Sequence, residues 1–274
     1  MALAHEELAE ASCGYRRSRQ LQVVTFATSV ASIFISGQYA YYPALVALIS
    51  QGLSWTLRAR AGHQQSTGDE GRMRGLLLDA LGPTTEHIDL ANLVNRISSG
   101  ARARATESVD PNYFASKAPP GVVRLRDHLQ ENAFWGKSLY GAAADRYSRL
   151  LGAFGVAAIA VVLIAIPLAP HGESLVLARV LVTALTAGAA LTQINEILSW
   201  RSAKSKIETV DRRLEVLVTF SEAKLMSQGI EALFAVFGDY CVATATSPPV
   251  PRSIYLRQRR HLNDLWDQMR HRTA

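Results

Sequence analysis

Two stretches of this 274-residue chain hold almost no charge, and they constrain its fold more than any other feature. Residues 21–57 contain no Asp, Glu, Lys or Arg, and residues 150–194 contain only Glu173 and Arg179. About 20 consecutive apolar residues span the hydrocarbon core of a bilayer as one helix. Each stretch is long enough for two such helices joined by a short turn. We therefore predict an all-α integral membrane protein with four transmembrane helices in two hairpins.

The predicted spans lie on either side of two short breaks. In the first stretch, Gly37 and Gln38 separate residues 21–36 from residues 39–57. In the second stretch, the turn 170–174 separates residues 150–169 from residues 175–194. Residues 150–169 are apolar on all sides, whereas a buried helix of a soluble protein usually keeps one polar edge.

The charged residues define the remaining parts of the chain. Residues 58–149 and 195–274 together hold 44 of the 52 charged side chains, and both connecting turns lack Lys and Arg. Since flanking basic residues are retained in the cytoplasm, both termini should be cytoplasmic. The expected parts are an N-terminal cytoplasmic helix (1–20), a first transmembrane hairpin (21–57), a cytoplasmic helical segment (58–149), a second hairpin (150–194) and a C-terminal cytoplasmic helical tail (195–274).

Polar side chains within the predicted spans follow a helical spacing. Hydroxyl residues recur every three or four positions along the first span, which places them on one face of a helix. The fourth span adds two threonines and a glutamine. The candidates for a pore lining, shared between the protomers of a homo-oligomer, are Thr25, Ser29, Ser32, Ser36, Thr183, Thr186 and Gln193. Packing between helices is the alternative explanation, because small and hydroxyl residues are common at such contacts.

Motifs for enzyme chemistry are incomplete. Gly136-Lys137-Ser138 ends like a phosphate-binding P-loop, but Glu131 stands where that loop needs its first glycine. The seven histidines show no zinc-binding spacing, and no GxSxG sequence is present. We therefore expect no catalytic activity, no metal and no cofactor. The basic residues are interspersed with acidic ones, so neither DNA nor RNA is an expected partner.

Two short motifs and the order of the parts resemble a known family. Asn132-Ala133-Phe134-Trp135 is similar to an Asn-x-x-Trp element, and residues 250–255 (VPRSIY) are similar to a Pro-x-x-x-Tyr element. Together with the two hairpins, these motifs resemble the bacterial SMODS-associating four-transmembrane effectors of cyclic-oligonucleotide antiphage signalling. One departure from the family pattern is Gly136, which stands where an acidic residue is expected.

The resemblance implies a function and a set of partners. It implies a multi-pass protein of the bacterial inner membrane that oligomerises or rearranges in the lipid bilayer and permeabilises it. The trigger would be a cyclic nucleotide made by a partner nucleotidyltransferase. A membrane-anchored helical interaction or scaffold protein and a constitutive small-solute channel remain as alternatives.

A nucleotide ligand would need aromatic rings for its bases and guanidinium groups for its phosphates. The residues of these types outside the predicted spans, with one asparagine, are Tyr113, Arg124, Arg126, Asn132, Trp135, Tyr140, Tyr255, Arg257 and Arg259. Packing between helices is the competing explanation for Trp135 and Tyr140. The basic helix predicted at residues 253–272 could meet anionic lipid headgroups or a phosphate-bearing ligand. The alternative is that its basic residues form a solvated face opposite a packed stripe of Tyr255, Leu262, Leu265 and Trp266.

Overall fold

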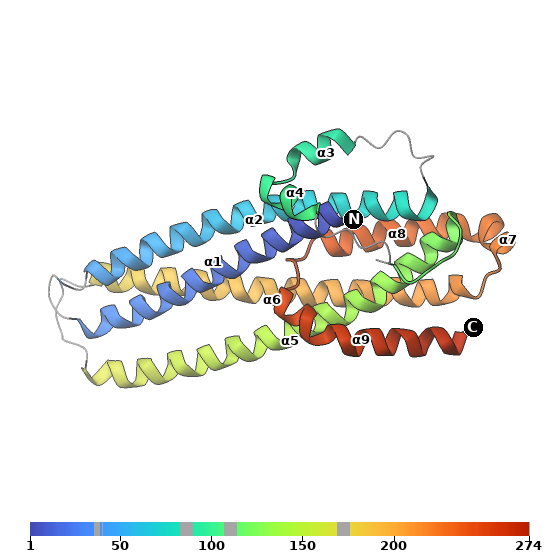
Figure 1. Ribbon diagram of the computed structural model, residues 1–274. Coiled ribbons are helices and arrows are strands. Elements are labelled where there is room, and N and C mark those ends of the chain that lie inside the picture. The colour runs from blue at the N-terminus through green and yellow to red at the C-terminus, as the bar shows by residue number, and fades with distance from the viewer. Residues whose placement is uncertain (36–38, 40, 83–89, 107–113, 169–175, 274) are drawn as a thin grey trace. The chain divides into compact units, whose positions relative to one another are not determined.

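The structure, a computed structural model, describes the chain except residues 36–38, 40, 83–89, 107–113, 169–175 and 274. It also leaves out the side chains of residues 33, 34, 161, 162, 164–168, 176–185 and 270–273. Every long regular element in the described residues is a helix, so the prediction of an all-α chain is confirmed (Figure 1).

The helices fall into a long and a short group (Figure 1). The long ones are α1 (Ala2–Phe34), α2 (Tyr41–Leu81), α5 (Val122–Leu168) and α6 (Val176–Val218). The short ones are α3 (Leu90–Arg96), α4 (Ser99–Ala105), α7 (Glu222–Lys224), a π-helical turn (Leu225–Gly229), α8 (Ile230–Ala245) and α9 (Arg252–Thr273). The proline-containing segment between α8 and α9 is not helical.

The prediction of four transmembrane helices is wrong. In the described part of the chain, no helix combines the length and the apolar character needed to cross a membrane. The multi-pass inner-membrane localisation, with both termini cytoplasmic, depended on these spans and is wrong for the same reason. The descriptions of the chain as a membrane protein and as a pore former lose their support as well.

The first two predicted spans show why the prediction of transmembrane helices failed. From Leu21 to its end at Phe34, α1 has 14 residues, about 21 Å of helix against a core of about 30 Å. In α2, the apolar run before Arg58 is interrupted by Ser50, Gln51 and Ser54. The charged part of α1 precedes Leu21, and α2 continues from Arg58 into charged sequence. The turn predicted between the third and fourth spans lies outside the described residues.

The chain forms two compact units. Unit 1 comprises Met1–Ser12, Gly62–Ala143 and Ser199–Ala274, and unit 2 comprises Cys13–Ala61 and Ala144–Leu198. Each long helix therefore contributes one segment to each unit. In unit 1, Gly136 on α5 packs against Ile207 on α6. Phe134 on α5 contacts Trp266 on α9, with ring centroids 5.2 Å apart.

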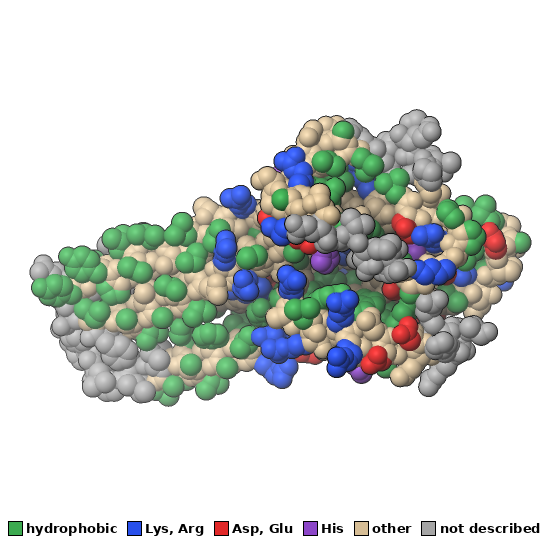
Figure 2. Space-filling view, in the orientation of Figure 1, with side chains coloured by type: hydrophobic (Ala, Val, Ile, Leu, Met, Phe, Trp, Pro, Cys, Tyr) green, Lys and Arg blue, Asp and Glu red, His purple; other side chains and the backbone are tan. Residues whose placement is uncertain are grey.

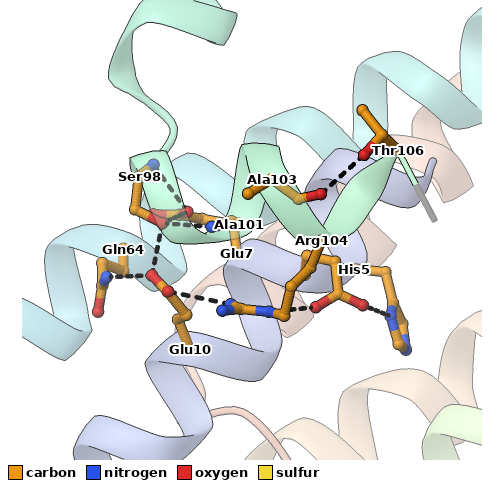
Figure 3. A network of polar contacts seen from close by, with 10 residues as sticks. His5, Glu7, Glu10, Gln64, Ser98, Ala101, Ala103, Arg104 and Thr106 are labelled. Atoms are coloured by element: carbon orange, nitrogen blue, oxygen red, sulfur yellow. Dashed lines mark hydrogen bonds and ion pairs between the residues drawn. The ribbon is translucent and has the colours of Figure 1, made fainter. Parts of the chain in front are cut away.

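A polar network attaches the short helix α4 to the start of α1 within unit 1 (Figure 3). Ser98 caps α4, because its Oγ accepts a hydrogen bond from the Ala101 amide at 3.2 Å. The buried Glu7 carboxylate accepts a hydrogen bond from the Ser98 amide at 3.0 Å. Arg104 donates to Glu10 at 2.9 Å. Glu6 also accepts a hydrogen bond from Arg104. Glu6, Glu7 and Glu10 therefore have a structural role in this network.

Four helix segments pack together in unit 2. Ser18 on α1 and Ser54 on α2 join their hydroxyls at 2.9 Å. Phe26 on α1 meets Phe154 on α5 edge to face, with centroids 6.0 Å apart. Small residues allow close approach of the α1 and α2 backbones, and Gly14 is the tightest point: a Cβ there would lie 2.8 Å from the Cβ of Ala61.

Gly14→Ala is therefore expected to lower the free energy of unfolding by about 1–3 kcal/mol, the usual cost of overpacking. The matched control is Gly52→Ala on α2, where an added Cβ meets nothing within 4 Å. That change should stabilise the chain by about 0.5–1 kcal/mol, since glycine weakens a helix interior. Urea denaturation followed by circular dichroism measures both. Equal effects of the two substitutions would contradict the close approach at Gly14.

Candidate functional site

The interior of unit 2 contains a buried group of three charges. The Glu196 carboxylate on α6 pairs with Arg19 of α1 at 3.1 Å and with Arg58 of α2. Its side chain is 2% exposed. The two guanidinium groups also lie over aromatic rings, Arg19 over Tyr147 at 4.6 Å and Arg58 over Tyr15 at 5.4 Å. Two cations thus share one carboxylate inside the unit, and neither arginine was a candidate from the sequence.

A glutamine layer lies one helical turn from these charges. Gln193 on α6, three residues before Glu196, donates a hydrogen bond to Gln22 on α1. Gln51 on α2 is fully buried, and neither atom of its amide has a hydrogen-bond partner among the described residues. A polar interior of this kind is unusual, because a buried polar group without a partner costs about 1–3 kcal/mol.

The hydroxyl stripe predicted from the sequence follows the same face of α1. Thr25 and Ser29 are buried, at 0% and 2% exposed. Thr25 donates to the carbonyl of Leu21 at 3.0 Å, and Ser32 donates to the carbonyl of Ser29 at 2.7 Å. On α6, Thr186 is half-buried. Ser36 and the side chain of Thr183 lie outside the described residues. The structure therefore buries Thr25 and Ser29 inside unit 2 and leaves Gln193 of the same unit half-buried.

The exterior of unit 2 is rich in large apolar side chains. Of the 26 large hydrophobic side chains that are exposed in the described residues, 19 belong to this unit. Figure 2 shows hydrophobic side chains over much of the visible surface of these helix segments, at its left. Among its described residues, unit 2 thus departs from the usual arrangement of a globular domain, because many polar side chains lie inside it while many large apolar side chains lie on its surface.

The predicted ligand residues belong to unit 1, and several of them surround His128. The His128 ring is fully buried and stacks on Phe114, with centroids 3.8 Å apart. Its Nε2 lies 2.6 Å from Asp79 Oδ2. Arg124 donates to the same carboxylate at 2.7 Å, and Asn132 donates to the backbone carbonyl of His128 at 2.8 Å. Arg124 and Asn132 were predicted from the sequence, but Asp79, which lies on another helix, was not.

Burial determines the ionisation of this group. Burial lowers the pKa of His128 below its ordinary value, although the hydrogen bond with Asp79 opposes the shift. Burial would raise the pKa of Asp79, but the hydrogen bonds from His128 and Arg124 hold that pKa below its usual range. The arrangement is therefore a neutral imidazole beside an ionised carboxylate. The other ring nitrogen, Nδ1, is buried, so this histidine is not placed to exchange a proton with a substrate.

The remaining candidates divide into engaged and exposed groups. Arg126 pairs with Asp127 at 2.8 Å. Tyr140 is buried, and burial raises the pKa of its hydroxyl. In contrast, Trp135 and Tyr255 are half-buried neighbours with centroids 5.8 Å apart.

The arginines of α9 complete this part of unit 1. Arg257 and Arg259, two and four residues after Tyr255, are exposed, as are Arg252 and Arg260. Tyr113 lies outside the described residues. Aromatic rings and unshielded guanidinium groups therefore occur together only at α9 and the facing part of α5 within the described candidates, and we call this group, Trp135, Tyr255, Arg257 and Arg259, the α9 surface.

Other chemistry finds little support. Among the described residues, no three His, Cys, Asp or Glu side chains are placed to hold a metal ion. Burial raises the pKa of the Cys241 thiol to about 11, which makes it a weak nucleophile at neutral pH.

Comparison of the chain with protein-family models, curated proteins and solved structures finds no match.

Proposed function

We propose that this protein is a ligand-triggered effector that acts by associating with further copies of itself. The observation that carries the proposal is the apolar exterior of unit 2. It includes Leu45 and Ile49, both 54% exposed and one turn apart on α2, and Leu163 and Leu191, 67% and 65% exposed. Large apolar side chains at this density need a partner to cover them.

The size of this surface favours a second copy as the partner. The 19 exposed side chains of unit 2 offer roughly 1,500 Å² of apolar area, against the 300–600 Å² of the largest patch on a typical monomer. A stable interface takes about 800 Å² from each partner. The exposed residues occur on all four helix segments of the unit, so each copy can contact more than one neighbour and build a closed oligomer.

The proposed trigger is a cyclic nucleotide supplied by a partner nucleotidyltransferase. The resemblance at residues 132–135 and 250–255 is the reason for naming this class of ligand. The α9 surface provides suitable chemistry, because Trp135 and Tyr255 can stack on bases while Arg257 and Arg259 can pair with phosphates. The two resembling motifs contain Trp135 and Tyr255, which the structure brings into contact.

Analytical ultracentrifugation of the purified chain, with and without a panel of cyclic di- and trinucleotides, tests the proposal. We expect a discrete increase in mass when the correct nucleotide is added. Leu45→Glu combined with Ile49→Glu should abolish that increase, because it places two charges on the association surface. Val216→Glu, at a 60% exposed position of unit 1, is the matched control and should leave it unchanged.

The outcomes separate the two parts of the proposal. A chain that stays monomeric at every concentration, or binds phosphatidylethanolamine–phosphatidylglycerol vesicles as a monomer, overturns self-association. Oligomers of one size that form regardless of nucleotide support self-association and exclude the trigger. An increase that survives Arg257→Gln with Arg259→Gln excludes the α9 surface as the ligand site.

A further inference from the structure

A non-helical segment of unit 1, residues 114–118, folds back along the first turns of α5. Three side chains on one face of α5, spaced three and four residues apart, hold this segment by hydrogen bonds. The bonds join Arg124 to the carbonyl of Ala118 at 3.4 Å, the Ser116 hydroxyl to Asp127 at 2.9 Å and the Ala115 amide to Glu131 at 3.0 Å. We call residues 114–118 the strap.

An aromatic contact adds to these hydrogen bonds. The ring of Phe114 in the strap stacks on His128 of α5, with centroids 3.8 Å apart and planes 18° from parallel. Phe114 is 7% exposed and the His128 side chain is 0% exposed. The next strap residue, Ala115, packs against the hydrophobic cluster that contains Phe134 and Trp266. The strap therefore covers a buried histidine and contributes to a cluster that α5 shares with α9.

The location of the imidazole proton follows from the partners of His128. Its Nε2 lies 2.6 Å from Asp79 Oδ2. An ionised carboxylate can only accept a hydrogen bond, so Nε2 carries the proton of the neutral ring. Nδ1 is buried and has no hydrogen-bond partner among the described residues. A second proton could enter only at Nδ1, where it would become a buried donor without an acceptor, which is costly.

Charged groups on two helices act on this ring. Asp79 on α2 and Asp127 on α5 favour the charged imidazole, and Arg124 on α5 opposes it. The strap's own charged residue, Lys117, is exposed. Burial has the largest effect and lowers the pKa of His128 below its ordinary value of 6.5. A ring that water can reach would regain a pKa near that value, so the attachment of the strap loses stability as the pH falls below about 6.5.

We propose that residues 114–118 are an acid-released strap, which detaches from α5 when His128 takes up a proton at Nδ1. The strap moves rather than the histidine, because the strap is non-helical whereas His128 lies within a helix of 47 residues. Its release withdraws Ala115 from the cluster that contains Phe134 and Trp266. Trp135 of the α9 surface packs against the same cluster, so acid changes the surroundings of that surface. The proposal goes beyond the proposed function and depends on neither its ligand nor self-association.

Hydrogen exchange of the full chain, followed by NMR between pH 7.5 and 5.0 and corrected for the intrinsic exchange rate at each pH, tests this proposal. The reporter is the Ala115 amide, which the Glu131 carboxylate holds in the closed strap. Its protection should fall by up to tenfold for each pH unit below about 6.5, as expected when opening takes up one proton. The Leu225 amide, which donates to the Ser221 carbonyl at 2.8 Å outside the strap, should keep its protection.

Two substitutions identify the group that titrates. His128→Gln removes the imidazole but keeps a donor for Asp79, so the protection of Ala115 should no longer depend on pH. His261→Gln, at an exposed position of α9, is the matched control and should behave like the unaltered chain. Constant protection of Ala115, a fall that persists in His128→Gln, or an equal fall at Leu225 overturns the proposal.

An NMR titration of the His128 ring in the unaltered chain provides a second readout that needs no variant. Protonation of the ring and the loss of Ala115 protection should follow the same pH curve, because the proposal makes them one event. A ring that gains its proton while the Ala115 amide stays protected overturns the proposal.

Discussion

Replacing Glu196 by leucine is expected to lower the free energy of unfolding by about 3–5 kcal/mol, because it leaves two buried cations without their carboxylate. Arg19 and Arg58 have side chains that are only 10% and 22% exposed. Both also face aromatic rings, which stabilise a cation less than a carboxylate does. Urea denaturation monitored by circular dichroism measures the change.

A triple variant separates the loss of the ion pairs from the loss of packing. Arg19→Met and Arg58→Met, combined with Glu196→Leu, remove all three charges while keeping similar volumes. Such replacements are often neutral or stabilising by about 1–4 kcal/mol, so most of the lost stability should return. If the triple variant is no more stable than Glu196→Leu alone, the stability lost in Glu196→Leu came from altered packing and not from the unpaired charges. The exposed pair Arg213–Asp239 offers a comparison, since Asp239→Leu should change stability by less than about 1 kcal/mol.

The charge group of unit 2 could not be predicted from the sequence because its members are far apart along the chain. Glu196 follows Arg19 by 177 residues and Arg58 by 138 residues. Helical periodicity correctly placed Thr25 and Ser29 on one face of a helix, and the structure shows that face to be buried. Periodicity carries no information on which helix faces which, so Gln193 could be identified as a polar residue but not as the partner of Gln22.

The prediction of four transmembrane helices failed because the absence of charged residues was treated as sufficient evidence for a membrane-spanning helix. Gln51 and Ser54 interrupt the most hydrophobic part of α2, and both are fully buried in unit 2. Their burial explains how a polar pair can occur in an uncharged stretch. The length of the first apolar run also argues against a span. From Leu21, α1 continues only to Phe34, which is short of the roughly 20 residues that a membrane-spanning helix needs.

The candidate ligand residues could not be fully assessed from the sequence either, because their partners lie on other helices. A guanidinium group can bind phosphate only if no carboxylate already holds it, and sequence alone identifies only neighbouring carboxylates. Asp127 next to Arg126 was visible in this way, and the two are paired. Asp79, which engages Arg124, lies 45 residues earlier on α2. The contact of Trp135 with Tyr255 also joins distant segments, although both residues were identified through the resembling motifs.

Trp200→Ala is expected to be the most damaging single substitution in unit 1, at about 3–5 kcal/mol. The Trp200 ring is fully buried on α6, and its Nε1 donates a hydrogen bond to the carbonyl of Pro248 at 2.9 Å. The neighbouring Ser247 donates to the carbonyl of Ser199 at 3.0 Å. These contacts attach the proline-rich segment before α9 to α6, so the alanine variant creates a cavity and also releases that segment.

Two controls identify the origin of this effect. Trp200→Phe keeps most of the volume but leaves the Pro248 carbonyl unpaired, so it should cost about 1–3 kcal/mol. Trp55→Ala removes a ring of the same size from a position that is 55% exposed and should cost less than about 1 kcal/mol. Urea denaturation ranks the three variants, and protease digestion of the alanine variant should cleave first at residues 246–251. If the Trp200→Ala chain is as stable as the Trp55→Ala chain, the prediction is wrong. That result would show that contacts other than Trp200 hold the proline-rich segment before α9.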